Sequence, residues 1–196
     1  MTYVAVLGTL TEFTDEPLPY DMRSLIQLVR QIHPDLLCLD LSPAQWQRRE
    51  FGGLPREYRE ALLPLSDSSD LVVVPIGTGE DPESRPLTGW KGWLAGLARK
   101  GLAFIQRTAP DPAALNSGWR HEAANFLYDL TVSLAGWHYE KFRMEHIENL
   151  TANIIRVARN DPGAKILAVV NLQYCHHIRP MLREQPGIEV VSYDQL

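Results

Sequence analysis

Cysteine, basic charge and long hydrophobic runs are all scarce in this sequence of 196 residues. The two cysteines, Cys38 and Cys175, are too few for a disulfide framework, so we expect both to be reduced and buried. No apolar run approaches the roughly 20 residues of a membrane span, and the chain does not start with a basic leader region. We therefore expect a cytoplasmic protein without a membrane partner.

The charge balance also excludes a class of partner. The sequence contains 19 basic and 24 acidic residues, for a net charge of -5. Proteins that neutralise phosphates normally carry a basic excess, so we expect no nucleic-acid partner. The 45% hydrophobic content is enough for one sizeable core, which predicts a single domain over residues 1–196.

Several catalytic motifs are missing. Gly77-Thr78-Gly79 starts like a dinucleotide-binding loop, but the third glycine is absent and carboxylates follow where the pyrophosphate would bind. His121-Glu122 lacks the second histidine of the zinc-protease helix, because position 125 is asparagine. The chain also has no Gly-x-Ser-x-Gly nucleophile elbow. These motifs therefore assign no reaction.

Five apolar runs bounded by turn residues predict β-strands. Their nearly continuous hydrophobicity is typical of strands buried on both faces of a parallel sheet. The runs cover residues 3–7, 35–41, 70–76, 165–170 and 188–193.

Between these runs, apolar residues recur at helical spacing. Helices are predicted over residues 21–32, 55–63, 116–135 and 140–160, with a further helix around Trp90 and Trp93. No strand is predicted over residues 87–160. The pattern predicts an α/β fold with three layers: a mainly parallel sheet of about five strands, and a helical insertion of residues 87–160 between the third and fourth strands.

Polar residues follow several of the predicted strands. In parallel strands these positions meet at one edge of the sheet, where open α/β proteins bind ligands. They are also ordinary turn and cap positions, as Ser42 before Pro43 would be, and the sequence leaves both interpretations open. The candidates are Thr9, Thr11, Glu12, Asp40, Asn171, Tyr174 and His176.

A second group of candidates lies on the last long helix. Phe142, His146, Asn149 and Asn153 recur at steps of four, three and four, so they share one stripe of the helix. Beside that stripe lie Ile147, Leu150 and Ile154, which we expect to face the sheet. The polar stripe is therefore either a set of hydrogen-bonded struts or the wall of a pocket, with Asn149 and Asn153 as ligand-binding candidates.

Cys175-His176-His177 offers residue types that bind metals or form a Cys-His nucleophile. Zinc requires three or four ligands, and no partner motif with suitable spacing is visible elsewhere. Adjacent residues at the start of a helix also point in different directions. We therefore expect no metal ligands here.

Three short segments resemble the motifs of a known superfamily. They are Gly8-Thr9-Leu10-Thr11 after the first strand, Asp40 at the second strand, and Asn171-Leu172-Gln173-Tyr174 after the late strand. The superfamily has Gly-x-x-His at the first and third places and glutamate at the second. The chain thus resembles a divergent member of the group that contains TraB/GumN-like proteins, TIKI metalloproteases, ChaN-like haem-binding lipoproteins and erythromycin esterases.

This resemblance implies the fold more than the reaction. Both motif histidines are replaced, by Thr11 and Tyr174. Threonine neither binds a metal nor takes a proton as a neutral imidazole does, and tyrosine, with an ordinary pKa of about 10, does so only if that pKa is strongly perturbed. Tyr174 and His176 are residue types that ligate haem iron in some relatives. The resemblance therefore implies an α/β domain that has kept the place of the site and lost the metal-dependent chemistry.

The favoured hypothesis is a divergent, non-catalytic ligand-binding domain with a polar pocket at the carboxyl edge of the sheet, for a small-molecule ligand of unknown identity. The alternative is an ester or amide hydrolase, with or without a metal, that uses a histidine general base. Its catalytic candidates are Asp40, His146 and His176. We also consider a homodimer, because tryptophan is enriched at interfaces; the residues concerned are Trp90, Trp93, Trp119 and Trp137.

Overall fold

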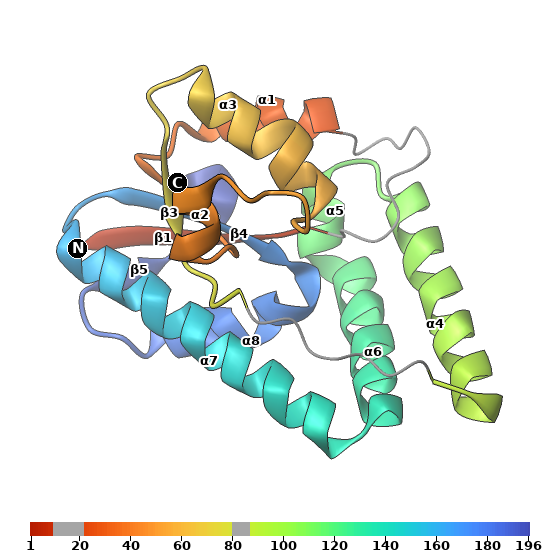
Figure 1. The fold of residues 1–196 in the computed structure, drawn as a ribbon. Coiled ribbons are helices and arrows are strands. Elements are labelled where there is room, and N and C mark those ends of the chain that lie inside the picture. The colour runs from red at the N-terminus through yellow and green to blue at the C-terminus, as the bar shows by residue number, and fades with distance from the viewer. Residues whose placement is uncertain (10–21, 80–86) are drawn as a thin grey trace.

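The core of the protein is a five-stranded parallel sheet with helices on both faces (Figure 1). The computed structural model describes residues 1–9, 22–79 and 87–196. The strand order is β3-β2-β4-β1-β5, and every strand pair is parallel. The predicted α/β fold with a parallel sheet is confirmed. The strands are β1 (Thr2–Thr9), β2 (Leu36–Leu39), β3 (Val72–Pro75), β4 (Lys165–Asn171) and β5 (Ile188–Val190).

The helices form two layers and a side group. One face of the sheet is covered by α1 (Met22–Ile32), a π-helical segment (Tyr58–Leu62) and α3 (Leu63–Asp67). The opposite face is covered by α7 (Trp137–Asn160) and α8 (Leu172–Arg183). The other helices are α2 (Pro43–Arg48), α4 (Gly89–Thr108), α5 (Pro112–Asn116), α6 (Gly118–Ala135) and a 3-10 turn (Tyr193–Gln195).

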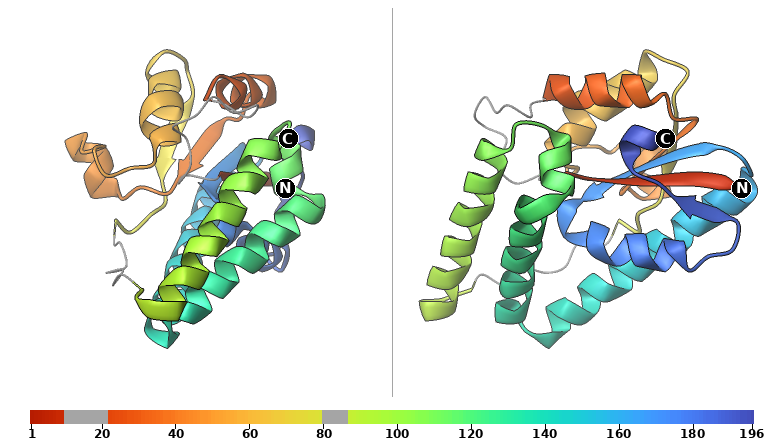
Figure 2. Two further views of the ribbon diagram at one scale, coloured as in Figure 1. Left: turned by 90° about the vertical axis from the view of Figure 1, so that its right-hand side faces the viewer. Right: turned by 180° about the vertical axis from the view of Figure 1, so that it is seen from behind.

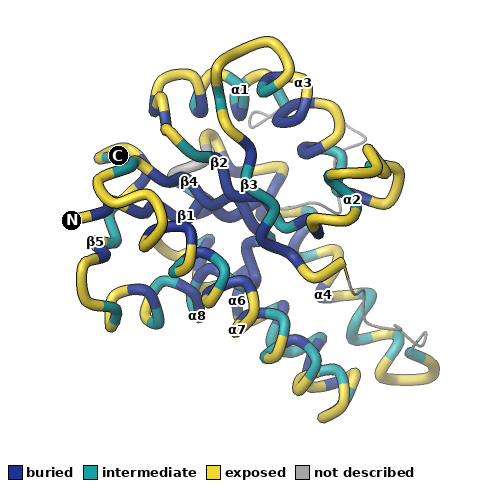
Figure 3. The backbone as a smooth tube through the Cα atoms, turned by 60° about the vertical axis from the view of Figure 1, so that its left-hand side comes forward, coloured by how far each residue is buried: buried dark blue, intermediate teal, exposed yellow. Residues whose placement is uncertain are grey.

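Alternate residues of the central strands face the two helical layers. Leu7 and Val169 pack under α1 and α3, whereas Val6 and Val170 pack under α7 and α8. All four side chains are almost fully buried, which explains why these strands have no polar face (Figure 3). Burial of one such side chain contributes roughly 1.5–3 kcal/mol to stability.

The order of the strands creates a switch point at the centre of the sheet. The chain runs outward from β1 to β2 and β3, and then returns to insert β4 between β1 and β2. Ligand sites of open α/β sheets form where the direction of winding changes, beyond the carboxyl ends of the strands. Thr9, Asp40 and Asn171 lie at those ends.

Helices α4, α5 and α6 lie beside the sheet and share a small core, to which Leu172 of α8 also contributes (Figure 2). Within the predicted helical insertion, α7 instead forms part of the layer on the sheet, because Ile147, Leu150 and Ile154 are buried against it. The expected orientation of that helix is confirmed.

Some element boundaries differ from the prediction. The backbone N–H of Leu41 bonds to the carbonyl of Leu39, which ends β2 before Asp40. The short helix α2 was not predicted, although Ser42 caps it and exchanges hydrogen bonds with Gln45 in a capping box. Of the two interpretations left open for Ser42, the structure thus shows the cap role. The fifth strand ends at Val190, and Tyr193 begins a 3-10 turn.

Both cysteines are free and buried, as expected. Within the part of the chain that the structure describes, no helix is long and apolar enough to cross a membrane.

Candidate functional site

Asp40 and His146 form a hydrogen-bonded pair at the carboxyl edge of the sheet. The Nε2 atom of His146 lies 2.8 Å from the Oδ2 atom of Asp40, across 106 positions of sequence. The side chains are 10% and 20% exposed, respectively. The sequence analysis identified Asp40 among the residues that follow strands and His146 on the polar stripe of the long helix. The structure brings the two side chains together.

The surrounding elements fix this pair. The buried face of α7 sets the rotation of the helix, and so directs His146 toward the end of β2. Gly77 leaves room for the carboxylate, because a Cβ atom at that position would collide with Oδ1 of Asp40. The bond from the N–H of Gly77 to the carbonyl of Leu41 keeps the two segments together.

Two more candidates are close to the pair. The ring of Tyr174 lies 5.2 Å from the ring of His146, tilted by 59°. Asn153 donates from Nδ2 to the carbonyl of Ile76 at 2.7 Å, which ties α7 to the end of β3. Asn149, on the same helix, is exposed. Asn153 thus acts as a strut, and Tyr174 adds a phenol to the site.

The polar residues at the ends of β1 and β4 have local partners. The hydroxyl of Thr9 is buried and donates to the carbonyl of Val170 at 3.4 Å. The side chain of Asn171 caps α8 by accepting a bond from the N–H of Gln173. The candidates Thr11 and Glu12 lie outside the described residues.

Glu57 and Tyr58 belong to this region and were missed by the sequence analysis. The hydroxyl of Tyr58 donates to the carbonyl of Val169 at 2.6 Å and accepts from the N–H of Asp40 at 3.4 Å. Burial, together with the charges of Asp40 and Glu57, raises the pKa of Tyr58 well above its usual value. Tyr58 is therefore a neutral strut that connects β2 with β4.

The carboxyl group of Glu57 is almost fully buried, and this burial raises its pKa; the nearby hydroxyl of Thr9 opposes the shift. A carboxyl group with a raised pKa in a polar site is a common feature of functional sites. No sequence pattern indicates this burial, because Glu57 stands in the charged run Arg56-Glu57-Tyr58-Arg59-Glu60, which is typical of an exposed helix.

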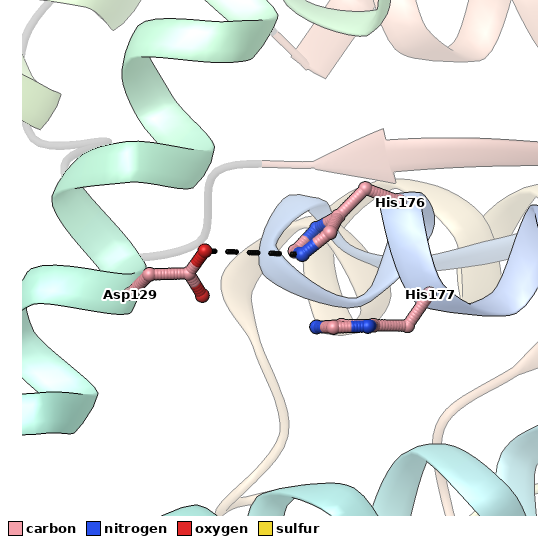
Figure 4. Close-up of side chains that lie close together, drawn as sticks. All are labelled: Asp129, His176 and His177. Carbon is pink, nitrogen blue, oxygen red and sulfur yellow. Dashed lines mark ion pairs between the residues drawn. The ribbon is translucent and has the colours of Figure 1, made fainter.

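A second cluster lies nearby, between α6 and α8. It contains Asp129, His176 and His177 (Figure 4). The Nε2 atom of His176 is 4.0 Å from Oδ2 of Asp129, and the two imidazole rings lie 3.8 Å apart between centroids. The expectation that the adjacent histidines point apart is wrong. Arg143 of α7 donates to Oδ1 of Asp129 at 2.8 Å.

Both histidines of this cluster are held in the neutral form. Burial and the adjacent imidazole of His177 lower the pKa of His176 to about 4. Burial and the guanidinium of Arg143 lower the pKa of His177. At neutral pH both rings therefore offer lone pairs rather than positive charge.

The two thiols are poor nucleophiles. Burial raises the pKa of Cys38 to about 12 and that of Cys175 to about 11. The reactive species is the thiolate, which is scarce at neutral pH for both residues. This argues against the Cys-His nucleophile considered for Cys175.

The tryptophans considered for a homodimer are all exposed. The exposed fractions are 66% for Trp90, 68% for Trp93, 60% for Trp119 and 65% for Trp137. The homodimer stays a prediction.

Comparisons with known protein-family models, with curated proteins and with solved structures returned no match. The resemblance to the TraB/GumN, TIKI, ChaN and erythromycin esterase group therefore rests on the motif positions alone.

Proposed function

We propose that the carboxyl edge of the sheet binds a small polar ligand through Asp40 and His146. The observation that carries this proposal is the 2.8 Å hydrogen bond between these side chains, at the switch point of a parallel sheet. This pair is partly accessible and is bordered by the ring of Tyr174.

The chemistry of the pair defines the ligand class. A carboxylate held by a histidine N–H keeps acceptor capacity on its oxygens, so it suits a ligand with hydroxyl or ammonium donors. Small polyols, amino sugars and amines have such groups.

The same pair favours a second function, hydrolysis of an ester or amide. With the proton on Nε2, His146 donates to Asp40 and carries its lone pair on Nδ1. Nδ1 is buried in this structure, so the attacking water would have to enter with the substrate. Asp40 would stabilise the imidazolium that forms when Nδ1 takes a proton from this water, and the imidazolium would return that proton to the leaving alcohol or amine. The phenol of Tyr174 would donate to the developing oxyanion. In this mechanism the general base is His146 rather than His176.

The test compares wild-type protein with Asp40→Asn and His146→Ala, using saturation-transfer NMR against a panel of polyols, amino sugars and amines. His138→Ala is the matched control, because His138 is exposed near the start of the same helix and stacks on Trp137. We expect Asp40→Asn and His146→Ala to weaken binding by roughly 10- to 100-fold, the effect of one hydrogen bond to a charged group. The control should bind as wild type does.

Thermal melts separate binding from support of the fold. A loss of about 1 kcal/mol lowers the melting temperature of a chain of this size by roughly 2–4 °C, and we expect no larger decrease in either variant. Severe destabilisation by both variants, with no panel member bound by the wild type, would identify the pair as a structural strut.

For hydrolysis, the same proteins are tested on chromogenic esters and amides. We expect His146→Ala to lower kcat/KM by roughly 100- to 10,000-fold, as for loss of a general base. If the wild type turns over no substrate across the pH range, the ligand-binding function stands alone.

A further inference from the structure

We propose that Asp129, His176 and His177 form a binding site for a divalent transition metal of the zinc class. This site differs from the pair of Asp40 and His146. It also differs from the motif positions Thr11, Asp40 and Tyr174 that carry the superfamily resemblance. None of the three proposed ligands occupies one of those positions.

The three side chains lie close enough to share one metal ion. One ring nitrogen of each histidine and one oxygen of Asp129 all lie within 4.8 Å of one another. Three ligand atoms around a tetrahedral zinc ion lie about 3.3 Å apart, given bond lengths of about 2.0–2.1 Å. The 4.0 Å from Nε2 of His176 to Oδ2 of Asp129 is already close to that value. Small rotations of the side chains would close the remaining gap.

The ligands come from two packed helices. Figure 4 shows both imidazoles projecting from α8 toward Asp129 on α6. The hydrogen bond from Arg143 holds Oδ1 of Asp129, and the Arg143 side chain is only 8% exposed. The second oxygen, Oδ2, is the one nearest His176. Such outer partners commonly orient the ligands of metal sites.

An unpaired ring nitrogen in the cluster also suits a metal. The Nε2 atom of His177 is buried and has no hydrogen-bond partner among the described residues. A hydrogen-bonded or metal-bound nitrogen is the normal state of a buried imidazole.

The donor set selects the metal. Two imidazoles and one carboxylate suit zinc and its neighbours cobalt, nickel and copper, whereas magnesium and calcium prefer oxygen ligands throughout. The positive charge of Arg143 weakens attraction of any cation, so we expect moderate affinity. With three protein ligands, one coordination position would stay open for water or a substrate.

The test measures Zn²⁺ binding to the chelator-treated full chain by titration calorimetry. Co²⁺ serves as a spectroscopic probe, because its visible absorbance reports the number of ligands. The variants are His177→Ala and Asp129→Asn. The matched control is His138→Ala, because His138 is exposed on α7 and stacks on Trp137 outside the cluster.

We expect one Zn²⁺ per wild-type chain, and a loss of affinity of at least about 100-fold in each cluster variant. Mg²⁺ should not compete, and His138→Ala should bind as wild type does. Circular dichroism checks the fold. If Asp129→Asn unfolds because Arg143 loses its partner, His177→Ala still tests the site. Absence of Zn²⁺ binding by wild type, or unchanged binding by His177→Ala, would overturn the proposal.

Asp40→Asn separates this site from the proposed function. That variant should keep wild-type Zn²⁺ affinity even where it loses the organic ligand. Loss of Zn²⁺ binding in Asp40→Asn would place the metal elsewhere and also count against the three ligands named here.

Discussion

At the scale of single residues, the structure shows how much a side chain depends on partners far away in the sequence. Asp40 and His146 were identifiable as candidates, because one follows a buried strand and the other borders the apolar stripe of a helix. Their mutual hydrogen bond joins residues 106 positions apart, and no local pattern predicts it. Glu57 gave no local signal at all, because only the tertiary fold buries it.

The burial of Glu57 leads to a prediction about stability. Its pKa is raised in the folded protein, so the charged form opposes folding. Glu57→Gln should therefore stabilise the protein at neutral pH, by about 1 kcal/mol or roughly 2–4 °C in melting temperature. Thermal melts across pH would measure this.

The sign of the pH dependence follows from proton binding. Between the ordinary glutamate pKa of about 4.3 and the higher folded value, the folded state holds more protons than the unfolded state. The contribution of Glu57 to stability therefore falls as pH rises through this window. The advantage of Glu57→Gln should disappear below the ordinary pKa. Glu148→Gln, at an exposed position of α7, is the control. A Glu57→Gln protein less stable than wild type at pH 7 would show that the carboxylate is needed.

At the scale of elements, periodicity was the reliable guide. The spacing of Ile147, Leu150 and Ile154 predicted the buried face of α7, because an amphipathic helix needs only its own sequence to define that face. The residues at which strands and helices begin and end were less predictable. At the end of β2, the N–H of Leu41 bonds to the carbonyl of Leu39, and the carbonyl of Leu41 accepts from the N–H of Gly77 after β3. The second bond joins two segments that are distant in the sequence, so the local sequence does not predict where β2 ends.

Gly77 tests how closely these two segments pack. A Cβ atom there would collide with Oδ1 of Asp40 and approach the N–H of Leu41 at 2.9 Å. Gly77→Ala should displace the carboxylate from His146, and so reproduce the ligand-binding defect of Asp40→Asn with an intact Asp40. NMR titration of the His146 ring and the ligand panel would measure this.

Gly53→Ala is the matched control for that change, because a Cβ atom at Gly53 meets no atom within 4 Å. Its His146 signals should match those of wild type. If Gly77→Ala also leaves those signals and the ligand affinity unchanged, the end of β3 is more adaptable than the close contact implies.

At the scale of the whole molecule, the fold class followed from the order of apolar runs, because continuous hydrophobicity and helical crossovers together specify a parallel sheet. The position of β4 between β1 and β2 did not follow, since strand order is fixed by contacts across the chain. The side group of α4, α5 and α6 was likewise recognisable only as helical. One buried asparagine supplies a polar link between this group and the sheet.

Asn116 makes that attachment. Its Oδ1 atom accepts from the N–H of Gly8 at 2.7 Å, and its Nδ2 donates to the carbonyl of the same residue at 3.1 Å. Arg179 of α8 donates to the same Oδ1 at 3.0 Å and to the carbonyl of Val6 at 2.9 Å. One side chain thus links α5, α8 and the carboxyl end of β1.

Asn116→Ala leaves these buried groups without their partner, which costs about 1–3 kcal/mol for each unsatisfied group. We expect the free energy of unfolding to fall by about that amount. Amide hydrogen exchange should accelerate in α4 and α6 more than in β1 and β4, because the small core of the side group loses its main polar link to the sheet. Asn149→Ala should change neither quantity. Uniform acceleration over all strands and helices would instead mean that the side group and the sheet unfold only as one cooperative unit.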